Sequence, residues 1–283
     1  MKILVPLDGS ECSETAIPWA KLLAQGLGGE ICLLRSYSVL ENLHLAPQLP
    51  VTVAELVNDD KLNSEVQQYL MRKSDDFDAL EVTLKSVHGR AAENILSAAE
   101  ESDLVVMASR GNSGLTKWLL GSVATKVVRG SVTPVMIVNT RHEEQPSPVR
   151  LKRIMVALDE SERAEVALQG AARIARAFDS NLILYEGIVK VWKTSGPDTW
   201  ADERAVGYLT AKKESLSGVQ AEVKVYRSSI GPEIVERAEA YEADLVVMAS
   251  HGRSGLSSWV LGSVTESVVQ RATFPVMVFY NRP

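Results

Sequence analysis

Two kinds of residue in this sequence have the types and positions needed to hold a phosphate-bearing ligand. One is an aspartate directly after a short apolar run, Asp8, which recurs as Asp159. The other is a glycine-rich segment, ASRGNSGLTKWLLGSV at 108–123, which recurs as ASHGRSGLSSWVLGSV at 249–264. Glycine lets the backbone turn sharply and approach a ligand. The Gly-Ser pair near the end of each segment opens a helix whose free N–H groups favour an anion. An acid beside such a loop suits a nucleotide.

The same residues also have structural interpretations that spacing alone leaves open. Gly111, Gly114 and Gly121 could set turns and a helix boundary and nothing more. Asp8 could cap the first helix, and the serines of the two Gly-Ser pairs could be ordinary N-caps. The four histidines show no ligand spacing, so a metal held by the protein alone is not expected.

The segments that must position these residues occur twice in the chain, as an internal sequence repeat. Residues 103–137 recur at 244–278 without a gap, and 21 of the 35 aligned positions are identical. The opening segments also match, KILVPLDGSE at 2–11 against RIMVALDESE at 153–162. We therefore expect two domains, residues 1–140 and 151–283, joined by a polar, proline-containing linker at 139–152.

Within each copy, short apolar runs alternate with helical patterns. The first copy predicts strands at 2–7, 31–34, 82–87, 104–108 and 135–138. It also predicts helices at 13–25, 91–101 and 122–129, and a mostly polar helix at 55–73 that we expect to be a solvated cover. The second copy predicts strands at 154–158, 182–185, 222–226, 245–249 and 276–279. This alternation indicates an α/β fold with a parallel sheet and helices on both faces.

Composition and charge argue against several function classes. The 283 residues are 46% hydrophobic and 23% charged, which is ordinary for a globular protein with a real core. The net charge of −6 argues against a nucleic-acid-binding surface. No apolar run approaches a membrane span, and the N-terminus shows no signal-peptide pattern. Because Cys12 and Cys32 have neither metal-ligand nor redox spacing, we expect reduced thiols in a cytoplasmic protein.

Both copies resemble the universal stress proteins, and the resemblance covers nearly the whole chain. Nucleotide-binding members of that family carry Gly, two residues, Gly, nine residues, then Gly-Ser or Gly-Thr. The first copy has that spacing with Ala108, Gly111 and Gly121-Ser122, and the second repeats it with Ala249, Gly252 and Gly262-Ser263. The departure is alanine for the first glycine in both copies. It adds one methyl near the expected ribose position, and a methyl needs little room where φ is negative.

The resemblance implies a specific fold and ligand: two tandem doubly wound five-stranded parallel sheets of order 3-2-1-4-5, Rossmann-like, binding ATP with Mg²⁺. The switch point of that order falls between the first and fourth strands, where Asp8 and the glycine segment already lie. Adenine would lie near Leu7 and Ser36, or near Leu158 and Gly187 in the second copy. The candidate contacts of the first copy are Pro6, Leu7, Asp8, Ser36, Ala108, Gly111, Gly114, Gly121, Ser122 and Val123. Those of the second are Leu158, Asp159, Gly187, Ala249, Gly252, Gly255, Gly262, Ser263 and Val264.

The resemblance also predicts how the copies associate. Family members commonly dimerise through the fifth strand, because its open edge invites pairing. Two copies in one chain are expected to make this pairing internally, through residues 135–138 and 276–279. Such a pseudo-dimer could associate again as a homodimer.

Three functions compete. The first is a cytoplasmic stress-response protein that binds ATP and acts as a sensor or regulator. The second is a nucleotide-free interaction module of the same family, in which Ala108 and Ala249 mark lost binding. The third, an enzyme of the wider adenine-nucleotide fold, is weak, because the sequence has no Walker A pattern and no placed base or nucleophile. We expect no enzyme activity beyond slow ATP hydrolysis.

The two copies differ beside the candidate site. Arg110 of the first is replaced by His251, so this phosphate-neutralising charge is not shared. The first copy reads DGS at 8–10 and the second reads DES at 159–161. The extra carboxylate, Glu160, would repel phosphate if it pointed inward. We therefore expect the first copy to bind ATP more tightly than the second.

Overall fold

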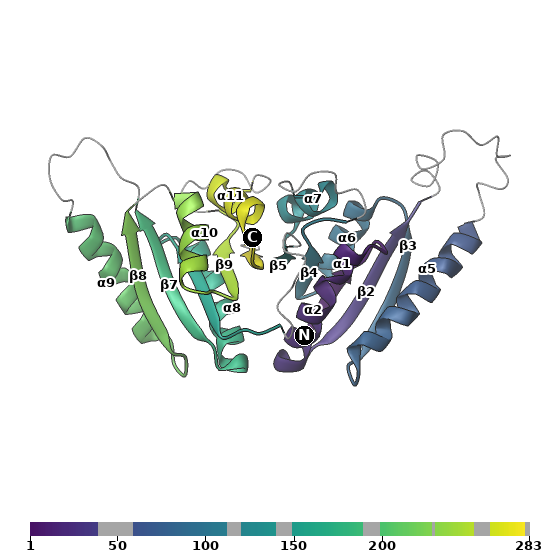
Figure 1. Cartoon of the computed structure of the whole chain (residues 1–283), viewed down its shortest axis with the longest axis horizontal. Helices are drawn as coiled ribbons and strands as arrows, with labels where there is room; N and C mark the ends of the chain where they lie inside the picture. The colour runs from purple at the N-terminus through teal and green to yellow at the C-terminus, as the bar shows by residue number, and fades with distance from the viewer. Residues whose placement is uncertain are drawn as a thin grey trace.

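The chain folds into two α/β halves of the same topology, as a computed structural model shows (Figure 1). The structure describes residues 1–38, 59–111, 120–139, 149–188, 199–227, 230–251 and 261–280. The strands of the first half are β1 (Lys2–Pro6), β2 (Glu30–Tyr37), β3 (Val82–His88), β4 (Leu104–Ala108) and β5 (Val135–Val138). Its helices are α1 (Glu11–Glu14), α2 (Ala16–Leu27), α5 (Asp59–Ser74), α6 (Ala91–Glu100) and α7 (Ser122–Gly130), with a short 3₁₀ turn at Asp75–Phe77.

The second half repeats this order. Its strands are β6 (Arg153–Leu158), β7 (Asn181–Ile188), β8 (Ala221–Arg227), β9 (Leu245–Ala249) and β10 (Val276–Phe279). Its helices are α8 (Glu162–Phe178), α9 (Thr199–Ser215), α10 (Ile230–Ala240) and α11 (Ser263–Arg271). No helix among the described residues is long and apolar enough to cross a membrane.

The strands of both halves form one continuous sheet. Its order is β3-β2-β1-β4-β5-β10-β9-β6-β7-β8, so each half has five parallel strands in the predicted order 3-2-1-4-5. The halves meet where β5 pairs antiparallel with β10, with Met136 opposite Met277. The predicted internal pairing of the fifth strands is therefore confirmed. Because β5 and β10 pair with each other, the edges of the combined sheet are β3 and β8. The central residues of these two strands include Lys85 and Lys224. Lysine on an edge strand discourages further pairing.

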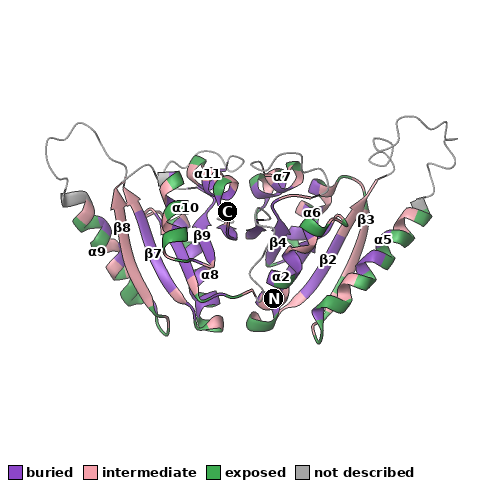
Figure 2. Cartoon of the chain, in the orientation of Figure 1, coloured by how far each residue is buried: buried purple, intermediate pink, exposed green. Residues whose placement is uncertain are grey.

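The central strands are apolar along their whole length because both faces of the sheet are covered. Leu104 to Ala108 are all buried, and β1 is buried after its first residue, whereas β3 and β8 are only partly buried (Figure 2). Successive residues of β1 alternate between the faces: Ile3 and Val5 pack toward α2, and Leu4 packs in the cluster that contains α6 and α7 residues. Each such side chain stabilises the fold by about 1.5–3 kcal/mol.

Two helices differ from what the sequence predicts, for local reasons. The single helix expected at 13–25 is divided into α1 and α2, and Pro18, which has no N–H, lies in the first turn of α2. Its counterpart α8 has no proline and is continuous. The predicted solvated cover, α5, is amphipathic instead: Val66, Tyr69 and Leu70 are buried against the sheet.

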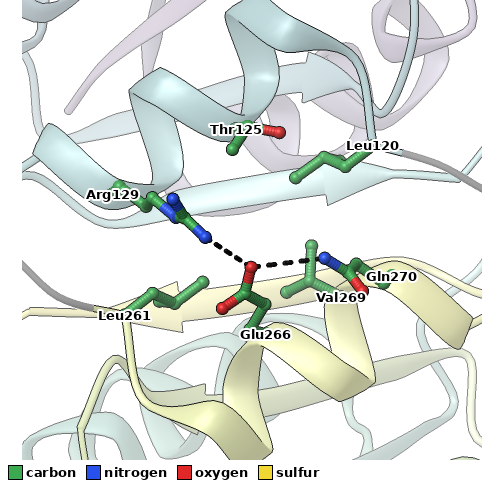
Figure 3. Close-up of a pocket in the computed structure, with 7 residues that line it drawn as sticks. All are labelled: Leu120, Thr125, Arg129, Leu261, Glu266, Val269 and Gln270. Carbon is green, nitrogen blue, oxygen red and sulfur yellow. Dashed lines mark hydrogen bonds and ion pairs between the residues drawn. The ribbon is translucent and has the colours of Figure 1, made fainter.

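A second contact between the halves lies beside the β5–β10 junction, where α7 and α11 run next to each other (Figure 1). Arg129 Nη2 of α7 donates to Glu266 Oε1 of α11 at 2.6 Å beside a small pocket, and Gln270 Nε2, one turn along α11, donates to the same oxygen at 3.3 Å (Figure 3). Tyr280 Oη also donates to the Val128 carbonyl at 2.6 Å. These contacts join the last turn of α7 to α11 and to the end of β10.

The described ends of the predicted linker are packed rather than loose. Asn139 is buried and its Nδ2 donates to the Phe274 carbonyl of the other half at 2.9 Å. Leu151 is buried in the core, and Lys152 N donates to Asp244 Oδ2 at 2.7 Å. Residues 140–148 lie outside the described residues. The covalent connection is therefore anchored to the fold at both described ends.

Candidate functional site

The aspartate after β1 is fixed by its own turn. Asp8 Oδ1 accepts from Ser10 N at 2.9 Å and from Ser10 Oγ at 2.6 Å. Ser10 in turn caps α1, since its Oγ accepts from Ser13 N at 3.1 Å. Gly9 between them has φ of 89°, a left-handed conformation that glycine adopts without strain. Asp8 therefore does not cap α1 itself, and its second carboxylate oxygen lies toward another part of the chain.

That other part is the glycine segment. A Cβ placed on Gly111 would overlap Asp8 Oδ2, so the backbone after β4 and the acid after β1 lie in direct contact. The two residues are far apart in sequence, and parallel strands β1 and β4 are neighbours in the sheet. The structure thus brings the two predicted parts of the first site together at the switch point.

The glycine segment is closed at its base by a backbone hydrogen bond. Gly121 N donates to the Ser109 carbonyl at 2.8 Å, and in the second half Gly262 N donates to the Ser250 carbonyl at 2.8 Å. A Cβ on Gly121 would lie 3.3 Å from the Ser109 oxygen, and one on Gly262 would lie 3.0 Å from the Ser250 oxygen. Glycine at these positions therefore permits a close backbone approach.

The helix starts differ from one structural interpretation of the sequence. The N-caps of α7 and α11 are Gly121 and Gly262, without a side-chain hydrogen bond, so the interpretation of Ser122 and Ser263 as N-caps is wrong. Both serines are exposed first residues of their helices. By helix geometry, the N–H groups of the first turn, including those of Val123 and Val264, have no partner within the helix. They form the anion-favouring end of each helix.

The expected adenine end lies across Asp8 from the glycine segment. Pro6 ends β1, and Leu7 is buried, its N–H donating to the Leu34 carbonyl at 2.8 Å. Ser36 is on the neighbouring β2, where its Oγ accepts from Asn94 Nδ2 at 3.1 Å. In the second half, Leu158 ends β6 and Gly187 is on the neighbouring β7.

The alanine that replaces the family's first glycine fits its place without strain. Ala108 and Ala249 are the last residues of β4 and β9 and are buried. Neither has a positive φ. Their methyl groups therefore lie within the packed end of the sheet. The other predicted glycines, Gly114, Gly252 and Gly255, lie outside the described residues.

The turn after β6 repeats that of the first half with one change. Asp159 Oδ1 accepts from Ser161 N at 3.2 Å and from Ser161 Oγ at 2.6 Å. Glu160 occupies the position of Gly9 with φ of 65°, which costs a non-glycine residue about 1 kcal/mol. Its carboxylate accepts two hydrogen bonds from Arg204 of α9, each at 2.9 Å. The extra carboxylate is therefore matched by a cation, which weakens the repulsion expected from it.

Sequence reasoning missed a larger difference between the halves. Arg35 of β2 and Glu186 of β7 occupy matched positions, each next to the residue that precedes the site aspartate. Arg35 lies 4.6 Å from the centre of the Tyr69 ring. Aligning β2 with β7 residue by residue would have found this exchange of a cation for an acid.

His251, the counterpart of Arg110, is a buried imidazole beside the second glycine segment. Its Nδ1 lies 3.1 Å from Ser250 Oγ, and its Nε2 has no hydrogen-bond partner among the described residues. Burial lowers the pKa of His251 below 6.5, and the positive charge of Arg163 lowers it further. The imidazole is thus neutral near pH 7.

This histidine predicts a pH dependence of stability. Since its pKa is lower in the folded than in the unfolded state, its stabilising contribution is present above pH 6.5 and is lost as pH falls through the folded value. By pH 5.5 the loss should reach at most about 1.4 kcal/mol. Urea unfolding at pH 7.5 and 5.5 should show a smaller pH effect in His251→Gln than in the wild type. His88→Gln is the control, because His88 is exposed. If the two variants reduced the pH effect on the free energy of unfolding equally, His251 would not be its source.

No group of three His, Cys, Asp or Glu residues in the described part of the chain could hold a metal ion. Both cysteines are free thiols, Cys12 exposed and Cys32 buried in the core.

This arrangement defines a class. Each half has a parallel sheet of order 3-2-1-4-5, which is the sheet of a Rossmann-like α/β domain. An acid follows the first strand and a glycine loop follows the fourth, so both lie at the switch point of the sheet. The chain contains two such domains.

Comparison with known proteins gives the family. Residues 1–139 and 150–279 each match the universal stress protein family, so the chain belongs to that family as a tandem member. It is 29% identical to a universal stress protein of Mycolicibacterium smegmatis, over 99% of this chain and 97% of that one. It is 30% identical to one of Mycobacterium bovis, over 70% and 69%. A crystal structure of a universal stress protein from Archaeoglobus fulgidus has the same fold, with a TM-score of 0.73, 24% identity, and coverage of 99% and 96%.

Proposed function

We propose that this universal stress protein binds ATP, with Mg²⁺ on its phosphates, at the carboxyl ends of β1 and β4. The observation that carries the proposal is the contact between Asp8 and Gly111. An acid and a side-chain-free backbone thus lie together at the carboxyl ends of two neighbouring strands, and α7 starts at the end of the same glycine segment. The protein would act in the cytoplasm as a sensor or regulator, through surfaces that respond to the bound nucleotide.

The described residues fit such a ligand. Asp8 would accept from a ribose hydroxyl or the base, and the N–H groups at Ser122 and Val123 would bind phosphate oxygens. Adenine would lie near Leu7 and Ser36. Magnesium would arrive with the phosphates, because it is commonly bound by phosphate oxygens and several waters in nucleotide sites. The bound ion supplies charge neutralisation, and we assign the protein's own residues binding and orientation only.

A second candidate, a nucleotide-free interaction module, is favoured by Ala108 and Ala249 at the family's glycine positions. The closed sheet edge at β5–β10 would then present the joined α7 and α11 as a protein-binding surface, in one chain or in a homodimer of chains. Nucleotide binding separates the two candidates directly.

Isothermal titration of the full-length chain with MgATP tests the proposal. The wild type should give a saturable isotherm, and Asp8→Asn, which keeps the shape of the side chain, should weaken binding at least about tenfold through loss of charged hydrogen bonds. Asp103→Asn, an acid that accepts from Lys2 N at the opposite end of the strands, is the matched control. Absence of heat up to millimolar MgATP would favour the interaction module.

A further inference from the structure

The two halves carry a cation on different elements at the carboxyl ends of their strands. In the first half, Arg110 comes two residues after the end of β4, and Cys12 lies in α1, which follows β1. The residues at these two places in the second half are His251 and Arg163. The cation has therefore moved from the segment after the fourth strand to the start of the helix after the first strand.

Arg163 lies in the first turn of α8, which follows the turn of Asp159. Because β6 leads into α8, and β9 runs parallel beside β6, this turn lies at the carboxyl ends of both strands, against which α8 packs. Arg163 is half-buried and makes no hydrogen bond or ion pair within the part of the chain that the structure describes. Its charge acts on His251, whose pKa it lowers. The guanidinium group is thus near the second glycine segment and available to a ligand.

His251 lies beside the start of α11. A Cβ on Gly262, the N-cap of this helix, would lie 3.5 Å from His251 Cα. Thr265 Oγ1 donates to the Ala249 carbonyl at 2.8 Å, which holds the first turn of α11 against the end of β9. His251 is 9% exposed, its Nδ1 faces Ser250 Oγ, and its Nε2 has no partner among the described residues. Since buried polar nitrogens are rarely left without a partner, this one indicates a missing ligand atom.

Three elements at this place carry charged groups. On α8 it is Arg163, which lowers the pKa of His251 after the larger effect of burial. After β6 it is Asp159, whose Oδ1 accepts from Ser161 N and Oγ. In the first turn of α11 it is Glu266, which pairs with Arg129 of the first half at 2.6 Å.

We propose that Arg163 and His251 form a binding site for a single phosphate group in the second half, together with the free N–H groups at the start of α11. This inference goes beyond the proposed function, which places MgATP in the first half. A guanidinium and a helix start carry roughly +1.5 charges, which matches the charge of one phosphate group, about −1.5 to −2 at pH 7. The guanidinium donates to two phosphate oxygens at once. The imidazole adds a donor at Nε2 when its Nδ1 accepts from Ser250 Oγ.

This site binds its ligand and a proton together. An anion beside the imidazole favours the charged form of His251, which burial and Arg163 oppose in the free protein. By reciprocity, protonation of His251 strengthens anion binding by the same factor. The affinity for the anion therefore rises as the pH falls below about 6.5.

NMR of the imidazole groups in the full-length chain locates the ligand, because the chain has four histidines. In a buffer without phosphate, millimolar inorganic phosphate should shift the signal that His251→Gln removes, and the shift should saturate. Arg163→Gln should weaken this binding at least about tenfold. Arg173→Gln is the matched control, since Arg173 is exposed on the same helix about 15 Å further along.

The control should bind phosphate as the wild type does, and thermal unfolding without ligand shows that each variant is folded. An unmoved His251 signal, or equal losses of affinity in the two arginine variants, would overturn the proposal. Neither result depends on MgATP, so a failure of the proposed function in the first half is recorded separately.

Competition distinguishes the two sources of a single phosphate group. Adenosine monophosphate should saturate the His251 signal at a lower concentration than inorganic phosphate if the ligand is a nucleoside monophosphate, and at an equal or higher one if it is free phosphate. Adenosine, which has no phosphate, should leave the signal in place. A shift with adenosine as large as that with the monophosphate would contradict recognition of the phosphate.

Sulfate tests the link to the proton, because its charge is constant between pH 5.5 and 7.5. Followed at the amide signal of Val264, sulfate should bind at least about threefold more tightly at pH 5.5 than at pH 7.5. His251→Gln should lose this difference. A difference that persists in His251→Gln would show that the imidazole takes no part in binding the anion.

Discussion

Replacing Gly111 by alanine is expected to abolish tight nucleotide binding and to destabilise the first half of the protein. The new Cβ would overlap Asp8 Oδ2. The carboxylate cannot move without losing its two hydrogen bonds from Ser10, which are worth about 1.5–3 kcal/mol each when the acceptor is charged. We expect a loss of about 1–3 kcal/mol in the free energy of unfolding and a fall of roughly a hundredfold in affinity for MgATP.

Urea unfolding and titration calorimetry measure the two effects. The matched control is Gly207→Ala, because a Cβ on Gly207 in α9 has no atom within 4 Å. Alanine is the better helix former by about 1 kcal/mol, so this control should be neutral or stabilising and should leave binding unchanged. If Gly111→Ala bound MgATP as the wild type does, the contact with Asp8 would have no part in the site.

Replacing Met136 by aspartate is expected to destroy the junction of the two halves. Met136 is fully buried and lies opposite Met277 where β5 pairs with β10. A carboxylate there would be removed from water beside an apolar partner, at a cost of at least about 4 kcal/mol. The free energy of unfolding in urea should fall by that amount, and limited proteolysis should cut the chain faster than it cuts the wild type, because the halves separate.

Met71→Asp provides the control, since Met71 on α5 is 63% exposed. It should change stability by less than about 1 kcal/mol, mostly through helix propensity. Similar losses in the two variants would show that the antiparallel junction does not hold the halves together.

The fold was predictable because its signals are local and repeated. The apolar runs at β1 and β4 indicate strands covered on both faces, and the second copy supports each element independently. Once the strand order is fixed, the switch-point rule brings Asp8 and Gly111 together without further information. The pairing of β5 with β10 was implied by the family resemblance, because members of that family commonly dimerise through the open edge of the fifth strand.

The details of the site were less predictable, because a residue's type does not give the direction of its side chain. Whether Glu160 would point inward and repel phosphate could not be read from the sequence, and its carboxylate is held by Arg204, 44 residues later. The position of Arg35 depends on the Tyr69 ring, and Tyr69 comes from α5, whose polar composition gave no sign of its apolar face. The N-cap of α7 is Gly121 and not Ser122, and the Gly121 N–H donates to the Ser109 carbonyl at the base of the glycine segment.

The most direct measurement of the central claim is native mass spectrometry of the freshly purified full-length chain, without added nucleotide and then with MgATP. The account predicts a mass increment of one ATP or ADP per chain, absent from Gly111→Ala and retained in Gly207→Ala. A bare mass in all three proteins, unchanged at millimolar MgATP, would contradict it and would leave the protein an interaction module that works through its surfaces.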